Sequence, residues 1–320
     1  MMPWLLSGLG LAILLLAGDA LVKGAVNLSL RVGVPALIVS LTIVAFGTSA
    51  PELLISVNAV LENKPGLALG NVVGSNTANV LLVLGVPALL SVLHTSDCHC
   101  SKTYLFMLGA SALFIGLAFL GEFTFVSGLI LLGVLAFILG DAFRQARAHR
   151  REAAALALAS DDSEDVEGAD PDMPWWQILV FLLLGLVGLP LGADILVDNA
   201  SIIARQFGVS DAVIGLTLVA FGTSLPELAT TVMAALRKQA DVALGNVIGS
   251  NMFNLLAIIG ITALVGDIPV DREFLNFDLW VMLGASLLLI PFVFFERDIS
   301  RIWGTALTGL YVIYVTLVLI

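Results

Sequence analysis

The chain has 320 residues, of which 59% are hydrophobic and 12% are charged, and its mean hydropathy is +1.04. A soluble core needs far less apolar content, so the composition excludes an ordinary soluble globular protein and predicts an integral membrane protein. The net charge of −11 is unevenly spread, because seven of the 25 acidic residues lie between Asp161 and Asp172. It gives no reason to expect a nucleic-acid partner.

Apolar segments recur from end to end, each long enough to cross about 30 Å of hydrocarbon, which takes roughly 20 helical residues. They lack the polar alternation of a transmembrane barrel, so we predict an all-α membrane fold. Residues 1–20 are apolar like a signal peptide but have no positive n-region, and we interpret them as part of the first span. The ten predicted spans are 3–22, 35–61, 67–93, 104–120, 123–143, 175–197, 212–236, 242–265, 277–295 and 302–320.

A sequence repeat divides the chain into two halves. LTIVAFGTSAPELL at 41–54 returns as LTLVAFGTSLPELA at 216–229 with 11 of 14 positions identical, and ALGNVVGSNTAN at 68–79 returns as ALGNVIGSNMFN at 243–254 with 9 of 12. Both pairs have an offset of 175, which indicates a duplicated five-helix unit. Five crossings are an odd number, so the second copy is predicted to be inverted. We expect units at 1–143 and 175–320, joined by an acidic linker at 144–174.

Lys and Arg residues are distributed unequally between the two predicted sides of the membrane. One set of connections holds eleven of them and the other set holds three. By the positive-inside rule the richer side is cytoplasmic. We therefore expect a multi-pass protein of the cell (inner) membrane, with both termini outside the cytoplasm and the acidic linker inside.

Glu52 lies in the second predicted span, which contains no basic residue near it. A charge at this depth costs several kcal/mol, so an intramembrane carboxylate is expected to face a polar interior and to mark an ion pathway. Thr48 and Ser49, four and three residues earlier, are predicted to lie on the same helix face. Pro51 lacks an N–H, so we expect a kink and a free carbonyl on Gly47. The second half repeats this arrangement with Gly222, Thr223, Ser224, Pro226 and Glu227.

The third predicted span carries a second polar stripe. Asn71, Ser75 and Asn79 recur at four-residue spacing beside Gly70 and Gly74, and the glycines are predicted to permit close helix contact. Carboxylate, hydroxyl, amide and carbonyl oxygens are hard donors suited to Na+, Ca2+ or Mg2+. Either the asparagines at the start of each stripe belong to such a site or they only join helices. The equivalent residues of the second half are Gly245, Asn246, Gly249, Ser250 and Asn254.

These segments resemble the two α-repeats of the cation/Ca2+ exchanger superfamily, whose hallmarks are paired GTSxPE and GNxxGSNxxN-type segments on inverted five-helix halves. The resemblance implies that Glu52 and Glu227 ligate the transported cation. It also implies help from the side chains of Thr48, Ser49, Ser75, Asn79, Thr223, Ser224, Ser250 and Asn254 and from the carbonyls of Ala45 and Ala220. Many sodium/calcium exchangers carry Asp where this chain has Asn254. Two carboxylates remain, which offset one Ca2+ or two Na+.

The leading functional interpretation is a secondary antiporter that exchanges Ca2+ for Na+ by alternating access in the lipid bilayer. The alternatives are H+-coupled Ca2+ exchange and Na+(Li+)/H+ exchange, because Asn254 removes a carboxylate and because protons compete with metal ions at desolvated carboxylates. A cation channel is less well supported, since no filter-like ring is evident. No His or Lys base accompanies the serines, so we expect no enzymatic activity, and no cofactor besides the transported ions.

One further cluster lies outside both repeats. His94, Cys98, His99 and Cys100 fall within seven residues and could bind a soft metal. The aligned stretch of the other half has no Cys or His, so we expect this cluster to have no role in transport. The acidic run at 161–172 lacks the glycine-turn spacing of a calcium loop, and we interpret it as a flexible linker.

Overall fold

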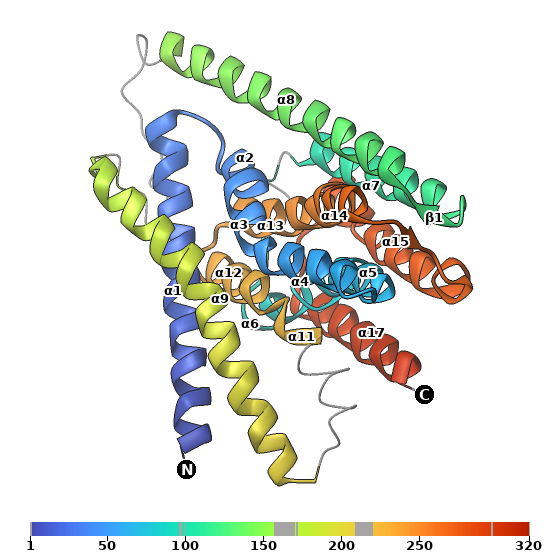
Figure 1. The fold of residues 1–320 in the computed structure, drawn as a ribbon. Helices are drawn as coiled ribbons and strands as arrows, with labels where there is room; N and C mark the ends of the chain where they lie inside the picture. Colours follow the sequence, from blue (N-terminus) through green and yellow to red (C-terminus); the bar gives the residue numbers. More distant parts are fainter. Residues whose placement is uncertain are drawn as a thin grey trace.

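The computed structural model describes residues 2–95, 98, 100–156, 170, 172–208, 220–295 and 297–319, and these residues are predominantly helical (Figure 1). Residues 157–169 and 171 of the predicted acidic linker, which include nearly all of its acidic run, lie outside the described residues. The elements of the first half are α1 (Met2–Val32), α2 (Ala36–Val39), the π-helical η1 (Ser40–Val44), α3 (Ala45–Thr48), α4 (Ala50–Leu61), α5 (Pro65–Leu81), α6 (Gly85–Leu90), α7 (Ser101–Ala118), β1 (Glu122–Phe123) and α8 (Phe125–Leu156).

The second half has the same order of long and interrupted helices. It meets the first half through two short backbone pairings. Strand β1 pairs antiparallel with β2, and Leu93 forms a single bridge with Ile299. The elements are α9 (Trp175–Gln206), α11 (Ala220–Gly222), α12 (Leu225–Leu236), α13 (Ala240–Met252), the π-helical η3 (Phe253–Ile258), α14 (Ile259–Val265), β2 (Ile268–Pro269), the π-helical η4 (Phe274–Asp278), α15 (Leu279–Leu287), α16 (Ile290–Phe294) and α17 (Arg301–Leu319).

The described residues contain eight helices long and apolar enough to cross a membrane, or nine if the bent pair Ala36–Thr48 and Ala50–Leu61 is one span. The all-α membrane prediction agrees with this, whereas the predicted count of ten is not confirmed. The difference lies at the predicted span 212–236. Residues 209–219 are outside the described part, and the apolar helix at the end of this span, Leu225–Leu236, is shorter than the others.

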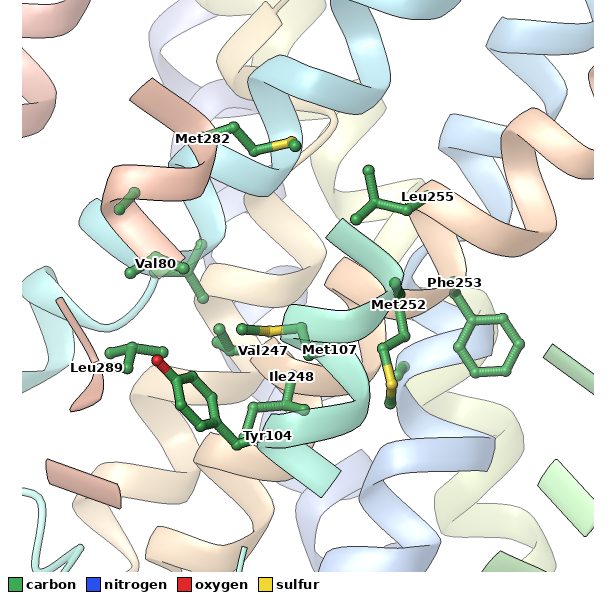
Figure 2. Close-up of a cluster of buried hydrophobic side chains, with 14 of the residues drawn as sticks. Val80, Tyr104, Met107, Val247, Ile248, Met252, Phe253, Leu255, Met282 and Leu289 are labelled. Carbon is green, nitrogen blue, oxygen red and sulfur yellow. The ribbon is translucent and has the colours of Figure 1, made fainter. Parts of the chain in front are cut away.

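The two spans that carry the GNxxGSNxxN-type segments form the centre of the molecule. Within their apolar windows, 83% of residues are buried for Pro65–Leu90 and 89% for Ala240–Val265, against 11% for Arg301–Val318. Figure 2 shows the apolar side of this centre, where Val247 and Ile248 of α13 lie beside Tyr104 and Met107 of α7. The polar side chains of these two spans are therefore enclosed by protein, away from lipid.

Helices α1 and α9 cross side by side at one edge of the molecule (Figure 1). Small residues allow the close approach, as in other membrane helix pairs. A Cβ added at Gly10 would lie 2.7 Å from the backbone N of Leu196, and one at Gly185 would lie 2.4 Å from the Cβ of Leu21. These two contacts exchange with each other under the offset of 175, as expected if the halves are copies of one unit.

Gly245 and Gly249 allow α13 to pack closely against the segment formed by α2, η1 and α3. A Cβ at Gly249 would lie 2.6 Å from the Cβ of Ala45 and 2.7 Å from the carbonyl oxygen of Leu41, and one at Gly245 would lie 3.0 Å from the carbonyl oxygen of Leu37. For Gly74, the counterpart of Gly249, the residues equivalent to Leu41 and Ala45 are Leu216 and Ala220. Leu216 lies outside the described residues, so close contact at Gly74 stays a prediction.

The close approach at Gly249 predicts a loss of stability when this glycine is replaced. Gly249→Ala is expected to destabilise the protein by about 1–3 kcal/mol, because the new methyl group collides with backbone that cannot move independently. Gly133→Ala, at an exposed glycine of α8, is the control, and it is expected to be neutral or to stabilise by up to about 1 kcal/mol, because alanine favours a helix over glycine. Thermal unfolding in one detergent measures both, and equal melting temperatures for the two variants would contradict the packing described.

Candidate cation-binding site

The chain breaks its helix just before Glu52. Helix α3 ends at Thr48, Ser49 has φ −86° and ψ 4°, and α4 starts at Ala50 with Pro51 in its first turn. The two helices are bent by 43° at this break. The expected proline kink is therefore present, and it places Glu52 in the first turn of α4. A carboxylate there is stabilised by the positive end of the helix dipole.

The second half repeats this geometry around Glu227. Ser224 has φ −88° and ψ 2°, and α12 comes next with Pro226 and Glu227 in its first turn. Both glutamates are 1% exposed, and the two turns that carry them are in direct contact through Ser49 and Glu227. Two positive helix ends and two buried carboxylates therefore converge from the two halves, an arrangement that attracts cations.

The hydroxyl groups of the first half reach across to the second. Ser49 Oγ donates a hydrogen bond to Glu227 Oε1 at 3.2 Å, and Thr48 Oγ1 donates to Asn246 Oδ1 at 3.4 Å. Helical spacing alone predicts both hydroxyls beside Glu52. The structure differs because the helix ends between Thr48 and Ser49, which changes the direction of the next side chains. Residues of both halves therefore form the site together, and hydrogen bonds connect them directly.

Asn71 and Asn246 join helices within each half. Asn71 Nδ2 donates to the carbonyl oxygen of Glu52 at 3.2 Å and to Ser56 Oγ at 3.0 Å, and Asn246 Nδ2 donates to the carbonyl oxygen of Glu227 at 3.4 Å and to Thr231 Oγ1 at 3.2 Å. Of the two alternatives considered for these asparagines, the geometry favours the packing role. They fix each glutamate-bearing turn to the neighbouring polar stripe.

Several buried polar atoms near this centre have no hydrogen-bond partner within the described part of the chain. They are Oε2 of Glu52, Oε2 of Glu227, Oδ1 of Asn76, Oδ1 of Asn79, Oγ of Ser250 and both Nδ2 and Oδ1 of Asn254. An unpaired buried polar group costs about 1–3 kcal/mol, and native proteins keep few of them. Such a concentration of free oxygen atoms has the donor chemistry of a hard-cation site.

The other predicted ligands are present in the same region but are placed less directly. Ser75, Asn79, Ser224 and Ser250 are buried, although in the described residues Ser75 and Ser250 make no hydrogen bond to either glutamate. Thr223 lies between α11 and α12, and Ala220 begins α11. The carbonyl oxygen of Ala45 already accepts Ser49 N–H at 3.0 Å and Thr48 Oγ1 at 3.3 Å, so binding a cation requires it to release the hydroxyl.

Sequence reasoning missed Asn76 and Asn251, which come directly after Ser75 and Ser250 in the two repeats. Asn79 Nδ2 donates to Asn251 Oδ1 at 3.1 Å, and Asn251 Nδ2 donates to the carbonyl oxygen of Asn76 at 3.4 Å. These bonds connect α5 to α13 across the two halves. Asn76 and Asn251 are identical at the offset of 175, so the repeat itself carried the signal.

The His94 and Cys cluster lies apart from this centre. Cys98 and Cys100 are buried free thiols, and His94 Nδ1 lies 2.8 Å from Asp298 Oδ2. Hydrogen bonding to Cys100, together with burial, raises the pKa of the Cys98 thiol. His99 lies outside the described residues, and among those described no three His, Cys, Asp or Glu side chains are grouped as a metal site.

Comparison with known proteins gives matches over both halves. The family model for sodium/calcium exchanger protein matches residues 2–141 and 177–320. The putative antiporter CaxA of Alkalimonas amylolytica is 35% identical over 292 residues, which cover 88% of this chain and 86% of that protein. Sodium/calcium exchanger MaX1 of Methanosarcina acetivorans is 33% identical over 339 residues, covering 96% of this chain and 95% of that protein.

Solved structures agree with these sequence matches. A structure of the sodium-calcium exchanger NCX_Mj, soaked with Na+ and Ca2+, is similar to this chain with a TM-score of 0.80 and 32% identity. The alignment covers 99% of this chain and 98% of the other. The likeness therefore extends over the full arrangement of helices.

Proposed function

This chain belongs to the sodium/calcium exchanger family, and from that membership we propose that it exchanges Ca2+ for Na+ across a cell membrane. The exchange proceeds by alternating access, in which the site between the two halves opens to one side of the membrane at a time. Both termini lie outside the cytoplasm. CaxA and MaX1 are named as an antiporter and an exchanger, which fits a transporter without enzymatic activity.

The observation that carries this proposal is the pair of buried glutamates joined across the halves by the Ser49 to Glu227 hydrogen bond of 3.2 Å. Glu52 and Glu227 supply the two negative charges of the site. Neutral oxygens complete the coordination of the ion, and the ligands we propose for them are Thr48, Ser49, Ser75, Asn79, Thr223, Ser224, Ser250, Asn254 and the carbonyls of Ala45 and Ala220. Six to eight oxygen ligands are usual for Ca2+.

Charge balance gives the coupling ratio that this site favours. Two carboxylates are neutralised by one Ca2+ or by two Na+, and a third Na+ would leave a positive charge in a low-dielectric site, which is strongly unfavourable. We therefore propose an exchange of two Na+ for one Ca2+ that moves no net charge.

One observation supports a second candidate. Asn254 is 1% exposed and neither of its side-chain polar atoms has a partner in the described residues, and it stands where many exchangers of this family carry Asp. A site with one carboxylate fewer suits exchange in which protons replace Na+, since two protons also neutralise two glutamates. H+-coupled Ca2+ exchange and Na+(Li+)/H+ exchange are the forms this would take.

Purified protein in sealed vesicles distinguishes the two candidates. We expect an outward Na+ gradient at equal pH to drive uptake of radioactive Ca2+ at least about tenfold faster than in protein-free vesicles. Dissipating the Na+ gradient with an ionophore should return uptake to the level of protein-free vesicles. Ca2+ uptake that needs a pH gradient and ignores Na+ would replace the first candidate with the second, and Ca2+ flux without any counter-gradient would indicate a channel.

A further inference from the structure

A groove lies on the outside of the second half, between α15 and α17. One cavity of this groove has a volume of about 260 Å³ and is lined by side chains that include Leu81, Phe277, Leu288, Leu310 and Tyr314. Apart from the hydroxyl of Tyr314, every lining side chain is apolar. Helix α17 is the least buried of the candidate spans in the described residues, so this groove opens toward lipid.

A second cavity continues the groove and is acidic. It has a volume of about 380 Å³, shares Phe277 and Leu317 with the first cavity, and adds Glu273, Asn276 and Asp278. Tyr314 Oη donates a hydrogen bond to Asp278 Oδ1 at 3.1 Å where the two cavities meet. Together they reach the size of ordinary small-molecule sites, about 300–1,000 Å³.

The acidic end lies where a candidate span begins. Phe274–Phe294 is that span, so Glu273 to Asp278 are expected at the boundary between water and lipid. Trp280 lies within the next turn, 50% exposed, and its Nε1 donates to the carbonyl oxygen of Leu275. Exposed tryptophan is typical of the headgroup region. The apolar cavity therefore extends from the headgroup level into the hydrocarbon.

The equivalent place in the first half is closed, so the fold does not require this groove. Under the offset of 175, Phe277 corresponds to Lys102, which forms an ion pair of 2.6 Å with Asp141. Leu310 and Ile313 correspond to Leu135 and Ile138, and the exposed fractions are 42% and 56% in α17 against 9% and 3% in α8. The groove is therefore open in the second half, whereas the equivalent side chains of α8 in the first half are buried.

We propose that this groove binds one phospholipid with a primary ammonium headgroup, such as phosphatidylethanolamine, its acyl chain in the apolar cavity and its ammonium group at Glu273 and Asp278. The apolar part excludes a free inorganic cation as the occupant. The carboxylates disfavour an anionic headgroup and favour a cation, and an ammonium group offers N–H donors for charge-assisted hydrogen bonds. A lipid chain also covers the exposed face of α17.

Native mass spectrometry of the full-length protein, titrated with phosphatidylethanolamine or phosphatidylglycerol in the same detergent, tests this proposal. We expect one molecule of phosphatidylethanolamine to bind more tightly than phosphatidylglycerol. Asp278→Asn keeps an acceptor for Tyr314 and should weaken phosphatidylethanolamine binding by up to about 5-fold, as for a partly exposed ion pair. It should leave phosphatidylglycerol binding unchanged.

A leucine at Gly284 fills the groove without disturbing the helix, because a Cβ there would meet no atom of the described residues within 4 Å. Gly284→Leu should weaken phosphatidylethanolamine binding by about tenfold or more, since it displaces several buried methylene groups. Gly109→Leu is the matched control at the equivalent position of the first half, where a Cβ is also clear of the described part of the chain by 4 Å.

Four outcomes would overturn the proposal. They are equal binding of the two lipids by the unaltered protein, unchanged lipid binding by Gly284→Leu, equal loss in Gly284→Leu and Gly109→Leu, and a mass of two chains with no bound lipid. The comparison of lipids by the unaltered protein needs no variant, so poor folding of a variant leaves the test intact.

Discussion

Glu52→Gln or Glu227→Gln is expected to reduce Ca2+ uptake into vesicles by about 100-fold or more. Glutamine keeps the size of the side chain but removes one of the two negative charges that offset the ion. Removing one partner of a buried charge pair costs about 3–5 kcal/mol, which corresponds to two or three orders of magnitude in affinity. Radioactive Ca2+ uptake driven by a Na+ gradient measures the effect.

Glu62→Gln is the matched control for this prediction. Glu62 comes directly after the last residue of α4, is exposed, and pairs with Lys64 at 3.0 Å, so the same substitution removes a charge outside the site. Ca2+ uptake by the Glu62→Gln variant should stay within about twofold of uptake by the unaltered protein. Thermal unfolding confirms that all variants are folded. Uptake near the unaltered rate in either Glu52→Gln or Glu227→Gln would remove these residues from the ion site.

Asn254→Asp is expected to make the exchange sensitive to membrane potential. A third carboxylate at this buried position is balanced by a third Na+, so three Na+ would leave the vesicle for each Ca2+ that enters. One charge moving across the membrane is worth about 2.3 kcal/mol per 100 mV. An interior-positive potential of about 60 mV should therefore accelerate Ca2+ uptake by about two- to tenfold.

The unaltered protein and Asn58→Asp are the references for this experiment. With two carboxylates in the site, exchange of two Na+ for one Ca2+ should not respond to a potential set by K+ and valinomycin. Asn58 is exposed on α4, so Asn58→Asp adds the same charge elsewhere and should behave like the unaltered protein. If uptake by the unaltered protein responds to the potential, the proposed exchange of two Na+ for one Ca2+ is contradicted. If uptake by Asn254→Asp does not respond, the assignment of Asn254 to the ion site is contradicted.

Much of the architecture could be predicted from the sequence because it depends on composition and repetition. The apolar segments predict membrane helices, and the proline before Glu52 predicts a kink, which the structure has as a bend of 43°. Burial of both glutamates, each 1% exposed, also agrees with the expectation for an intramembrane carboxylate. The ion-binding role of the predicted ligands stays a prediction.

Contacts between the two halves could not be predicted, because helical spacing gives only the neighbours on one helix. Ser49 is three residues from Glu52 in the sequence, yet its hydroxyl bonds to Glu227 of the other half. Identical motifs in the two halves predict the same local geometry but not which other helices pack against them.

The most direct test of the central claim, that the transported cation binds between Glu52 and Glu227, is a crystal structure of the protein soaked with Sr2+ and measured for anomalous scattering. Sr2+ is a hard divalent cation with the same preference for oxygen ligands as Ca2+. We expect an anomalous peak between the two carboxylates and in contact with both. A peak elsewhere in the protein, with neither glutamate as a ligand, would contradict the claim.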